Sequence, residues 1–90
     1  MSSIRERMAG LLTPLSADVF EFEDQSHLHV GHAGNRGGGH YAVLLVSSVF
    51  AGQNRINRQR TVQNLLAVLF DEGLIHALSI RALTPEEYFQ

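Results

Sequence analysis

The sequence predicts an α+β fold, a two-layer α/β sandwich in which a three-stranded mixed sheet carries both long helices on one face. A length of 90 residues allows one hydrophobic core. Apolar residues repeat at helical spacing in residues 4–13 and 57–73, whereas residues 18–23, 41–46 and 75–83 have the patterns of strands. Two helices of about three turns cannot cover both faces of a sheet, so we expect both on the same face.

The first helix opens with a capping signature. Ser3 and Glu6 form the S-x-x-E pattern, in which each side chain satisfies a backbone amide at the helix start. Pro14 predicts that this helix ends near residue 13, because proline disrupts a helix interior. The apolar stripe of this helix comprises Ile4, Met8, Leu11, Leu12 and Leu15.

In residues 18–23, DVFEFE, phenylalanine and glutamate alternate, which indicates a half-exposed strand.

The later elements follow from similar signals. Residues 41–46, YAVLLV, are apolar throughout, which predicts a central strand covered on both faces or nearly so. Asn57 is the expected N-cap of the second helix, and Gly73 its end. We expect the first two strands to be antiparallel, and the third, residues 75–83, to be reached through a right-handed crossover. In residues 84–87, TPEE, a cap followed by proline predicts a short C-terminal helix.

The composition excludes several classes of function. The net charge is −2, and all seven basic residues are arginine. Because there is no cysteine, the chain can form neither disulfides nor thiolate metal ligands. No nucleophile motif and no phosphate-binding glycine loop before a helix is present, so we expect no enzyme activity. No apolar run is long enough for a signal peptide or a membrane span, which favours one soluble cytoplasmic domain over residues 1–90.

Residues 27–41, HLHVGHAGNRGGGHY, contain four of the five histidines and five of the eight glycines. A structural zinc site would need four fixed ligands, usually including cysteine. Ordering so many glycines costs chain entropy, which makes such a site on its own unfavourable. A solvated, mobile loop is the simpler interpretation of the composition. The histidines concerned are His27, His29, His32 and His40.

Two further features have two interpretations each. His76 follows a predicted helix end in apolar surroundings, which is more typical of a core or boundary histidine than of a ligand. Arg55, Arg58 and Arg60 surround the start of the second helix, where the helix dipole disfavours cations. They are either solvated side chains or a contact for a partner that carries phosphates or carboxylates.

Seven short motifs are spread over almost the whole chain, and they are Ile4-Arg5, Asp24-Gln25-Ser26, His40-Tyr41, Val46-Ser47 with Phe50-x-Gly52, Asn57-Arg58-x-Arg60, Ile75-His76-Ala77-Leu78 and Thr84-Pro85-Glu86-Glu87. Together they resemble the BolA-like proteins. The resemblance implies a fold similar to class II KH domains, in agreement with the predicted order of elements. The family usually has arginine-histidine-arginine at the start of the long helix, but the middle residue here is Gln59, so any role of that histidine is lost.

The resemblance implies a non-enzymatic partner of a monothiol glutaredoxin, with which it would share a [2Fe-2S] cluster in iron–sulfur assembly or iron sensing. Glutaredoxin would supply a cysteine, and glutathione its thiol. This chain would supply His76 and one histidine of the loop, so the isolated protein should carry no cofactor. Counted from the Asp-x-Ser motif, His29 is the better match, and the alternatives are His27, His32 and His40. Imidazole ligands would raise the potential of the cluster and make its binding sensitive to pH.

The resemblance also implies an alternative function, a DNA-binding transcriptional regulator of stress response and cell morphology that acts through the KH-like surface. Arg55, Arg58 and Arg60 would then contact phosphates. The negative net charge and the lack of lysine oppose this interpretation. We expect the free protein to be a monomer or a weak homodimer. Shortening residues 30–39 should alter the affinity for a cluster-loaded partner but hardly the stability of the fold.

Overall fold

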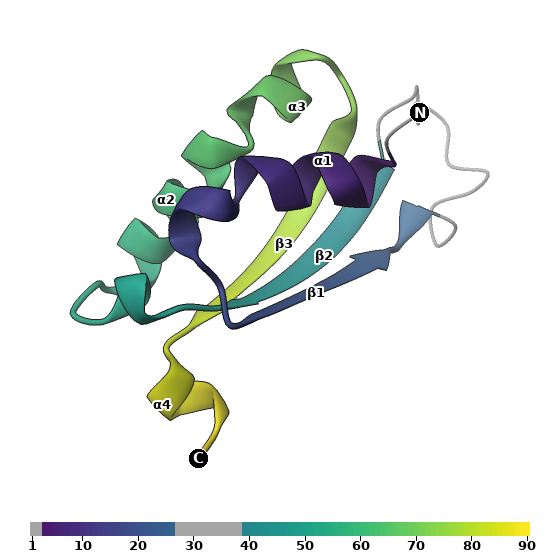
Figure 1. Cartoon of the computed structure of the whole chain (residues 1–90). Coiled ribbons are helices and arrows are strands. Elements are labelled where there is room, and N and C mark those ends of the chain that lie inside the picture. The colour runs from purple at the N-terminus through teal and green to yellow at the C-terminus, as the bar shows by residue number, and fades with distance from the viewer. Residues whose placement is uncertain (1–2, 27–38) are drawn as a thin grey trace.

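The computed structural model describes residues 3–26 and 39–90. Its three strands form one sheet in the order β1-β2-β3, with β1 antiparallel and β3 parallel to β2 (Figure 1). The predicted mixed sheet and element order are therefore confirmed. In chain order the elements are α1 (Ile4–Leu11), η1 (Thr13–Leu15), β1 (Val19–Asp24), β2 (Gly39–Val46), η3 (Ser48–Phe50), α2 (Arg55–Leu65), α3 (Ala67–Asp71), β3 (Ile75–Leu83) and α4 (Pro85–Tyr88).

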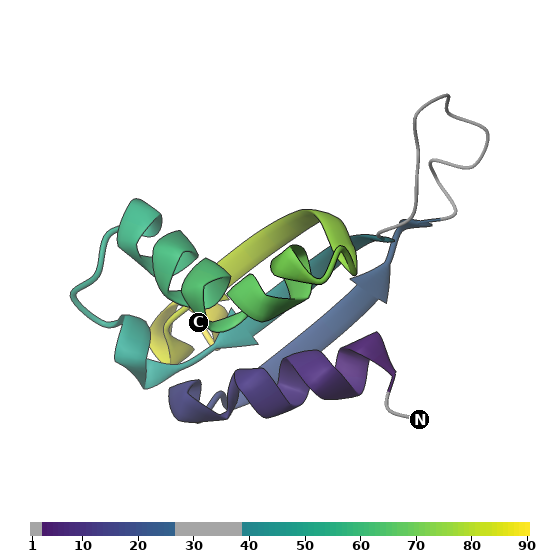
Figure 2. The same ribbon diagram turned by 90° about the horizontal axis from the view of Figure 1, so that it is seen from above.

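The helices α1, α2 and α3 lie on the same face of the sheet, as predicted (Figure 2). The hydrophobic core lies between them and the sheet. Its fully buried side chains come from both layers, and they are Met8, Leu45, Val46, Phe50, Val62, Leu66 and Leu69. None of the helices within residues 3–26 and 39–90 is long and apolar enough to cross a membrane.

β2 is central in the sheet, as predicted, but α1, α2 and α3 cover only one of its faces (Figure 2). Val43 and Leu45 are buried, whereas Ala42 and Leu44, which point to the opposite face, are only half-buried. The helices α1, α2 and α3 occupy a single face, so the other face carries apolar side chains that none of these three helices covers (Figure 2). An apolar run alone does not distinguish these two arrangements.

The caps are confirmed in three cases and corrected in one. Ser3 with Glu6 and Thr84 with Glu87 both form complete capping boxes. Gly73, at φ +76°, follows the end of α3 as expected. The N-cap of α2 is Asn54 and not Asn57, because the Asn54 Oδ1 accepts the backbone N–H of Asn57 at 2.8 Å.

Two helices differ in extent from the prediction. The first α-helix ends at Leu11, and a 3-10 turn that contains Pro14 follows it. The long helix is interrupted at Leu66, which separates α2 from α3.

Ser47 explains one of the family motifs. Its side chain is buried, and its hydroxyl donates to the Leu15 carbonyl at 2.5 Å while it accepts the Val49 N–H at 3.2 Å. The residue thereby joins the two 3-10 turns at one end of the sheet. A buried hydroxyl is tolerated here because it is hydrogen-bonded.

Candidate functional site

The first part of the site lies where β1 ends and β2 begins. This is the base of the histidine-rich segment of residues 27–41, which is called the histidine loop below. The Asp24 Oδ1 accepts the N–H of Ser26 at 2.9 Å, and the Ser26 Oγ accepts the N–H of His40 at 3.0 Å. The Gln25 N–H donates to the His40 carbonyl at 2.7 Å. The Asp-x-Ser motif therefore fixes the backbone of His40 on both sides.

Gly39 allows the chain to enter β2 close to an aromatic ring. A Cβ atom at this position would overlap the ring of Tyr41, which packs against Phe22 at 5.4 Å between ring centroids. The Gly39 N–H donates to the carbonyl of Leu74 at 3.0 Å, so the start of β2 is also tied to the segment before β3. These contacts place His40 beside the first residues of β3.

A bulge brings His76 to the same place. Gly39 pairs with Ile75, but His40 pairs with Ala77, so His76 is an extra residue in β3. The imidazole rings of His40 and His76 lie 5.0 Å apart, centroid to centroid, with an angle of 43° between their planes. His76 is exposed and His40 is half-buried. His76 is therefore not a core residue, whereas the interpretation as a boundary residue agrees with its exposed position at the start of β3.

The spacing of the two rings fits a shared metal ion. Two imidazoles that bind one tetrahedral ion through nitrogens at about 2.0 Å have centroids about 5 Å apart. Within residues 3–26 and 39–90, no group of three or more histidine, aspartate or glutamate side chains could hold a metal ion. The described pair is thus suited to a centre for which a partner supplies further ligands. His27, His29 and His32 lie outside the described residues, so their roles stay predictions.

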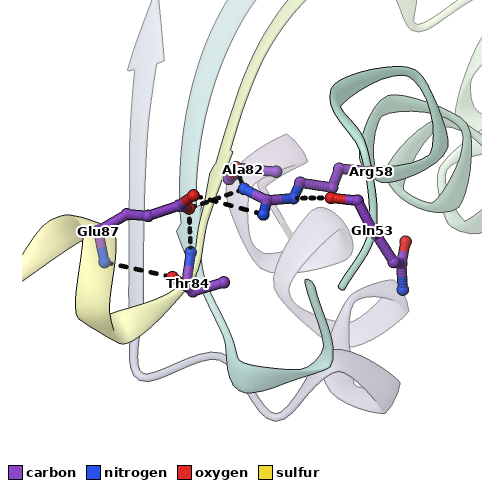
Figure 3. A network of polar contacts seen from close by, with 5 residues as sticks. All are labelled: Gln53, Arg58, Ala82, Thr84 and Glu87. Carbon is purple, nitrogen blue, oxygen red and sulfur yellow. Dashed lines mark hydrogen bonds and ion pairs between the residues drawn. The ribbon is translucent and has the colours of Figure 1, made fainter. Parts of the chain in front are cut away.

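The arginine cluster at the start of α2 divides into two kinds. Arg58 turns inward, and its guanidinium donates to the Gln53 carbonyl at 2.9 Å, the Ala82 carbonyl at 3.0 Å and the Glu87 carboxylate at 2.7 Å (Figure 3). Arg55 and Arg60 are exposed. Only these two of the three predicted phosphate contacts are open to solvent, and Arg58 instead joins α2 to β3 and α4.

Arg58 strongly affects its acidic partner. The hydrogen bond that it donates, followed by one from the Thr84 N–H, lowers the pKa of Glu87 from the ordinary value of 4.5 to about 2. Because Glu87 also closes the capping box of α4, one carboxylate both starts this helix and holds it against α2.

Two polar residues outside the predicted site have clear positions. The Gln59 amide, where the family usually has histidine, donates to the Ile80 carbonyl of β3 at 2.8 Å. Arg81 is exposed on the same strand and lines a cleft with Arg55 and Arg58. Sequence reasoning missed Arg81, although an arginine within an apolar strand was an available signal.

Known proteins resemble this chain over nearly its whole length. The family model described as "BolA-like protein" matches residues 11–87. "Protein BOLA1, chloroplastic" from Arabidopsis thaliana is 41% identical over 90 residues, which cover 96% of this chain and 54% of that protein. The chain therefore spans about half the length of this relative. Since that relative is named as chloroplastic, the cytoplasmic location of this chain stays a prediction.

One further relative and one solved structure extend the comparison. "DNA-binding transcriptional regulator BolA" from Escherichia coli is 35% identical over 86 residues, covering 94% of this chain and 79% of that protein. The solved structure of the BolA domain of SufE1 from Arabidopsis thaliana superimposes with a TM-score of 0.80 at 35% identity, covering 97% of this chain and 99% of that one. The predicted α+β fold is the fold of these proteins.

Proposed function

Because the chain belongs to the BolA-like family, we propose that it is a non-enzymatic partner of a monothiol glutaredoxin, with which it holds or transfers a [2Fe-2S] cluster. The observation that carries this proposal is the pair of His40 and His76, 5.0 Å apart where the histidine loop joins the sheet. His76 stands on a bulge of a paired strand, so its position is constrained, while its ring is open to a partner.

The ligand set combines residues from three molecules. Glutaredoxin contributes a cysteine, glutathione contributes its thiol, and this chain contributes His76 and a second histidine. His29 fits the spacing from the Asp-x-Ser motif, and His40 fits because its ring lies 5.0 Å from that of His76. Neutral imidazoles in place of two thiolates raise the reduction potential of such a cluster. They are also released on protonation, which suits transfer or sensing better than storage.

The proposal is tested by mixing this chain with cluster-loaded monothiol glutaredoxin and recording visible absorption and affinity. We expect the wild type to change the spectrum, and His76→Ala to abolish that change while the fold is retained, because His76 is exposed. Ser79→Ala, at an exposed position on the same strand, is the control and should behave as wild type. Comparing His29→Ala with His40→Ala identifies the second ligand. An unaltered spectrum and affinity with His76→Ala would remove the ligand assignment.

A second candidate function is DNA binding by the start of α2. It is supported by exposed Arg55 and Arg60 and by the 35% identity to a relative named as a DNA-binding regulator. Two phosphate contacts would make binding weak and strongly dependent on salt. We expect Arg55→Gln and Arg60→Gln each to reduce a low-salt gel shift. The absence of any shift by the wild type at low salt would rule this function out.

A further inference from the structure

The strand β1 (Val19–Asp24) lies along one edge of the sheet (Figure 1). The Gln25 N–H donates to the His40 carbonyl, so in this antiparallel ladder the odd-numbered residues of β1 are the ones that bond to β2. The N–H and carbonyl groups of Phe20 and Phe22 therefore point outward, away from β2. They form no hydrogen bond with any residue in the described parts of the chain.

The opposite edge of the sheet is covered by side chains. At β3, the Gln59 amide donates to the Ile80 carbonyl and the Arg58 guanidinium donates to the Ala82 carbonyl. Within residues 3–26 and 39–90, no side chain covers the edge of β1 in this way. An uncovered edge is a template to which an extended segment of another protein can add as a strand.

The two faces of β1 differ in chemistry. Phe20 and Phe22 pack against the core, whereas Glu21 and Glu23 are exposed on the open face, which is the face that α1, α2 and α3 leave uncovered. Glu23 accepts a hydrogen bond from the neutral Gln25 amide at 2.9 Å, which leaves its charge in place. Neither glutamate forms an ion pair with any described residue. Successive side chains of an added strand therefore meet an apolar and an acidic surface in turn.

A groove beside Phe20 offers room for an apolar side chain on the helix side of β1. Its volume is about 270 Å³, and it lies between α1, η1 and the start of β1. In an added strand, the residue directly opposite Phe20 has its Cβ about 5 Å from that of Phe20, on the same face. An aliphatic side chain at that position is next to the groove. The apolar residues that line the groove are Ala9, Leu12, Ala17, Phe20 and Leu45.

The acidic surface is not neutralised by the sheet itself. Glu21 pairs with Leu44 and Leu44 pairs with Arg81, so two strand spacings, about 10 Å, separate the backbones of Glu21 and Arg81. All three residues line a hollow of about 440 Å³ on the open face. Arg5 of α1 is also close to β1, but its guanidinium lies over the Phe20 ring at 5.9 Å, on the helix side. A cation on an added strand would be one spacing from the glutamates.

We propose that the outer edge of β1 binds an extended basic segment of a partner protein, which adds to the sheet as an antiparallel strand. Its apolar residues lie opposite Phe20 and Phe22, and its arginines or lysines lie opposite Glu21 and Glu23. Opposite charges on directly facing residues stabilise a pair of strands. The partner is therefore a protein with an exposed segment in which apolar and basic residues alternate.

Other occupants match this edge less well. β1 contains no basic residue, so pairing with β1 of a second copy would place glutamates beside glutamates, which is destabilising. Nucleic acid would be repelled by the same carboxylates. His76 is on β3, at the other edge of the sheet, so the proposal does not depend on cluster binding.

The test is NMR titration of the whole chain with synthetic peptides. The matching peptide is Thr-Val-Arg-Val-Arg-Val-Thr, and a second peptide has glutamate in place of both arginines. We expect the arginine peptide to bind at least about tenfold more tightly than the glutamate peptide. At a free concentration about tenfold above its Kd, it should slow amide exchange of Phe20 and Phe22 by about tenfold. The amides of Glu21 and Glu23, which already bond to β2, should change much less.

A third peptide separates strand pairing from attraction between charges. It is the arginine peptide with N-methyl groups on its valines, whose N–H groups would face the edge of β1. The methyl groups keep both charges but remove these donors, so we expect binding to be lost.

Protein variants test the contribution of charge. The double variant Glu21→Arg with Glu23→Arg should prefer the glutamate peptide, because it reverses both facing pairs. Glu86→Arg, at an exposed position of α4, is the control and should keep the preference of the wild type. Glu21 and Glu23 are exposed, so the double variant is expected to fold.

Four results would overturn the proposal. The first is the absence of binding by the arginine peptide. The second is binding that leaves amide exchange of Phe20 and Phe22 unchanged, or equally tight binding of the N-methylated peptide, since either indicates attraction to a charged surface without strand pairing. The third is a preference for the arginine peptide that survives in the double variant. The fourth is protection of Phe20 and Phe22 in the free chain that increases with protein concentration, which would make a second copy the occupant.

Discussion

The ion pair of Arg58 with Glu87 gives Arg58 a different role from the phosphate contact that the sequence predicted for it. Arg58 lies near the start of α2, where the dipole opposes a cation, and this position suggested an external phosphate as its partner. The partner is instead the Glu87 carboxylate of α4, 2.7 Å away and 29 residues later in the sequence. No local pattern predicts a contact over that separation.

The lowered pKa of Glu87 predicts a specific dependence of stability on acid. The folded-state pKa of about 2 lies below the ordinary value of 4.5, so the ionised form stabilises the fold above pH 4.5. This contribution is lost as the pH falls from 4.5 to about 2. Glu87→Gln keeps a capping side chain but lacks the charge. We expect the difference in free energy of unfolding between wild type and Glu87→Gln to shrink over this range in chemical denaturation.

Glu86→Gln is the control for this measurement. Glu86 is exposed in the same first turn of α4 and has no partner in the described parts of the chain. Its substitution should produce a much smaller pH-dependent difference. A difference between wild type and Glu87→Gln that stays constant down to acid pH would contradict the assigned cause of the shift.

At the scale of elements, side chains of α2 donate hydrogen bonds to carbonyl groups of β3 that do not pair with β2. Gln59 binds the carbonyl of Ile80, and Arg58 binds that of Ala82. β3 is an edge strand, and unpaired carbonyls on such an edge invite pairing with another chain. Gln59, the departure from the usual family motif, thus has a structural role in this protein.

Gln59→Ala should lower the free energy of unfolding by about 1 kcal/mol, because a half-buried carbonyl loses its donor. Gln59→His restores a ring N–H donor and should stay within about 0.5 kcal/mol of wild type. Gln63→Ala makes the same truncation at an exposed position of the same helix and controls for helix propensity. Equal effects of Gln59→Ala and Gln63→Ala in urea denaturation would show that the bond to Ile80 contributes nothing.

The elements also show which features can be predicted from sequence. Capping boxes such as Ser3 with Glu6 were predictable because all their partners lie within one turn. The N-cap of α2 was misplaced because Asn54 and Asn57 are equally good caps in composition, and only the backbone conformation selects between them. The open face of β2 was missed because burial depends on how many helices are available.

The candidate site was predictable only in part. Resemblance pointed to His76, whereas its position beside His40 depends on a bulge that no periodicity reveals.

At the scale of the whole molecule, the two ends of β3 have different chemistry. One end carries the imidazole pair beside the base of the histidine loop. At the other end α4 follows the strand (Figure 1), and its Glu87 binds Arg58 of α2. The buried core between helices and sheet separates them. This arrangement implies that His76→Ala leaves the ion pair of Arg58 and Glu87 intact, so the imidazole pair can be altered without disturbing the other end of the strand.

The most direct test of the central claim, that His76 is a cluster ligand, is pulsed electron paramagnetic resonance of the reduced complex with glutaredoxin. Only this chain is labelled with the heavy nitrogen isotope, so that nitrogen bound to iron is traced to it. We expect strong nitrogen couplings that change with the label and of which one disappears in His76→Ala. Nitrogen couplings that do not change with the isotope label, or that are the same in His76→Ala as in the wild type, would contradict the account.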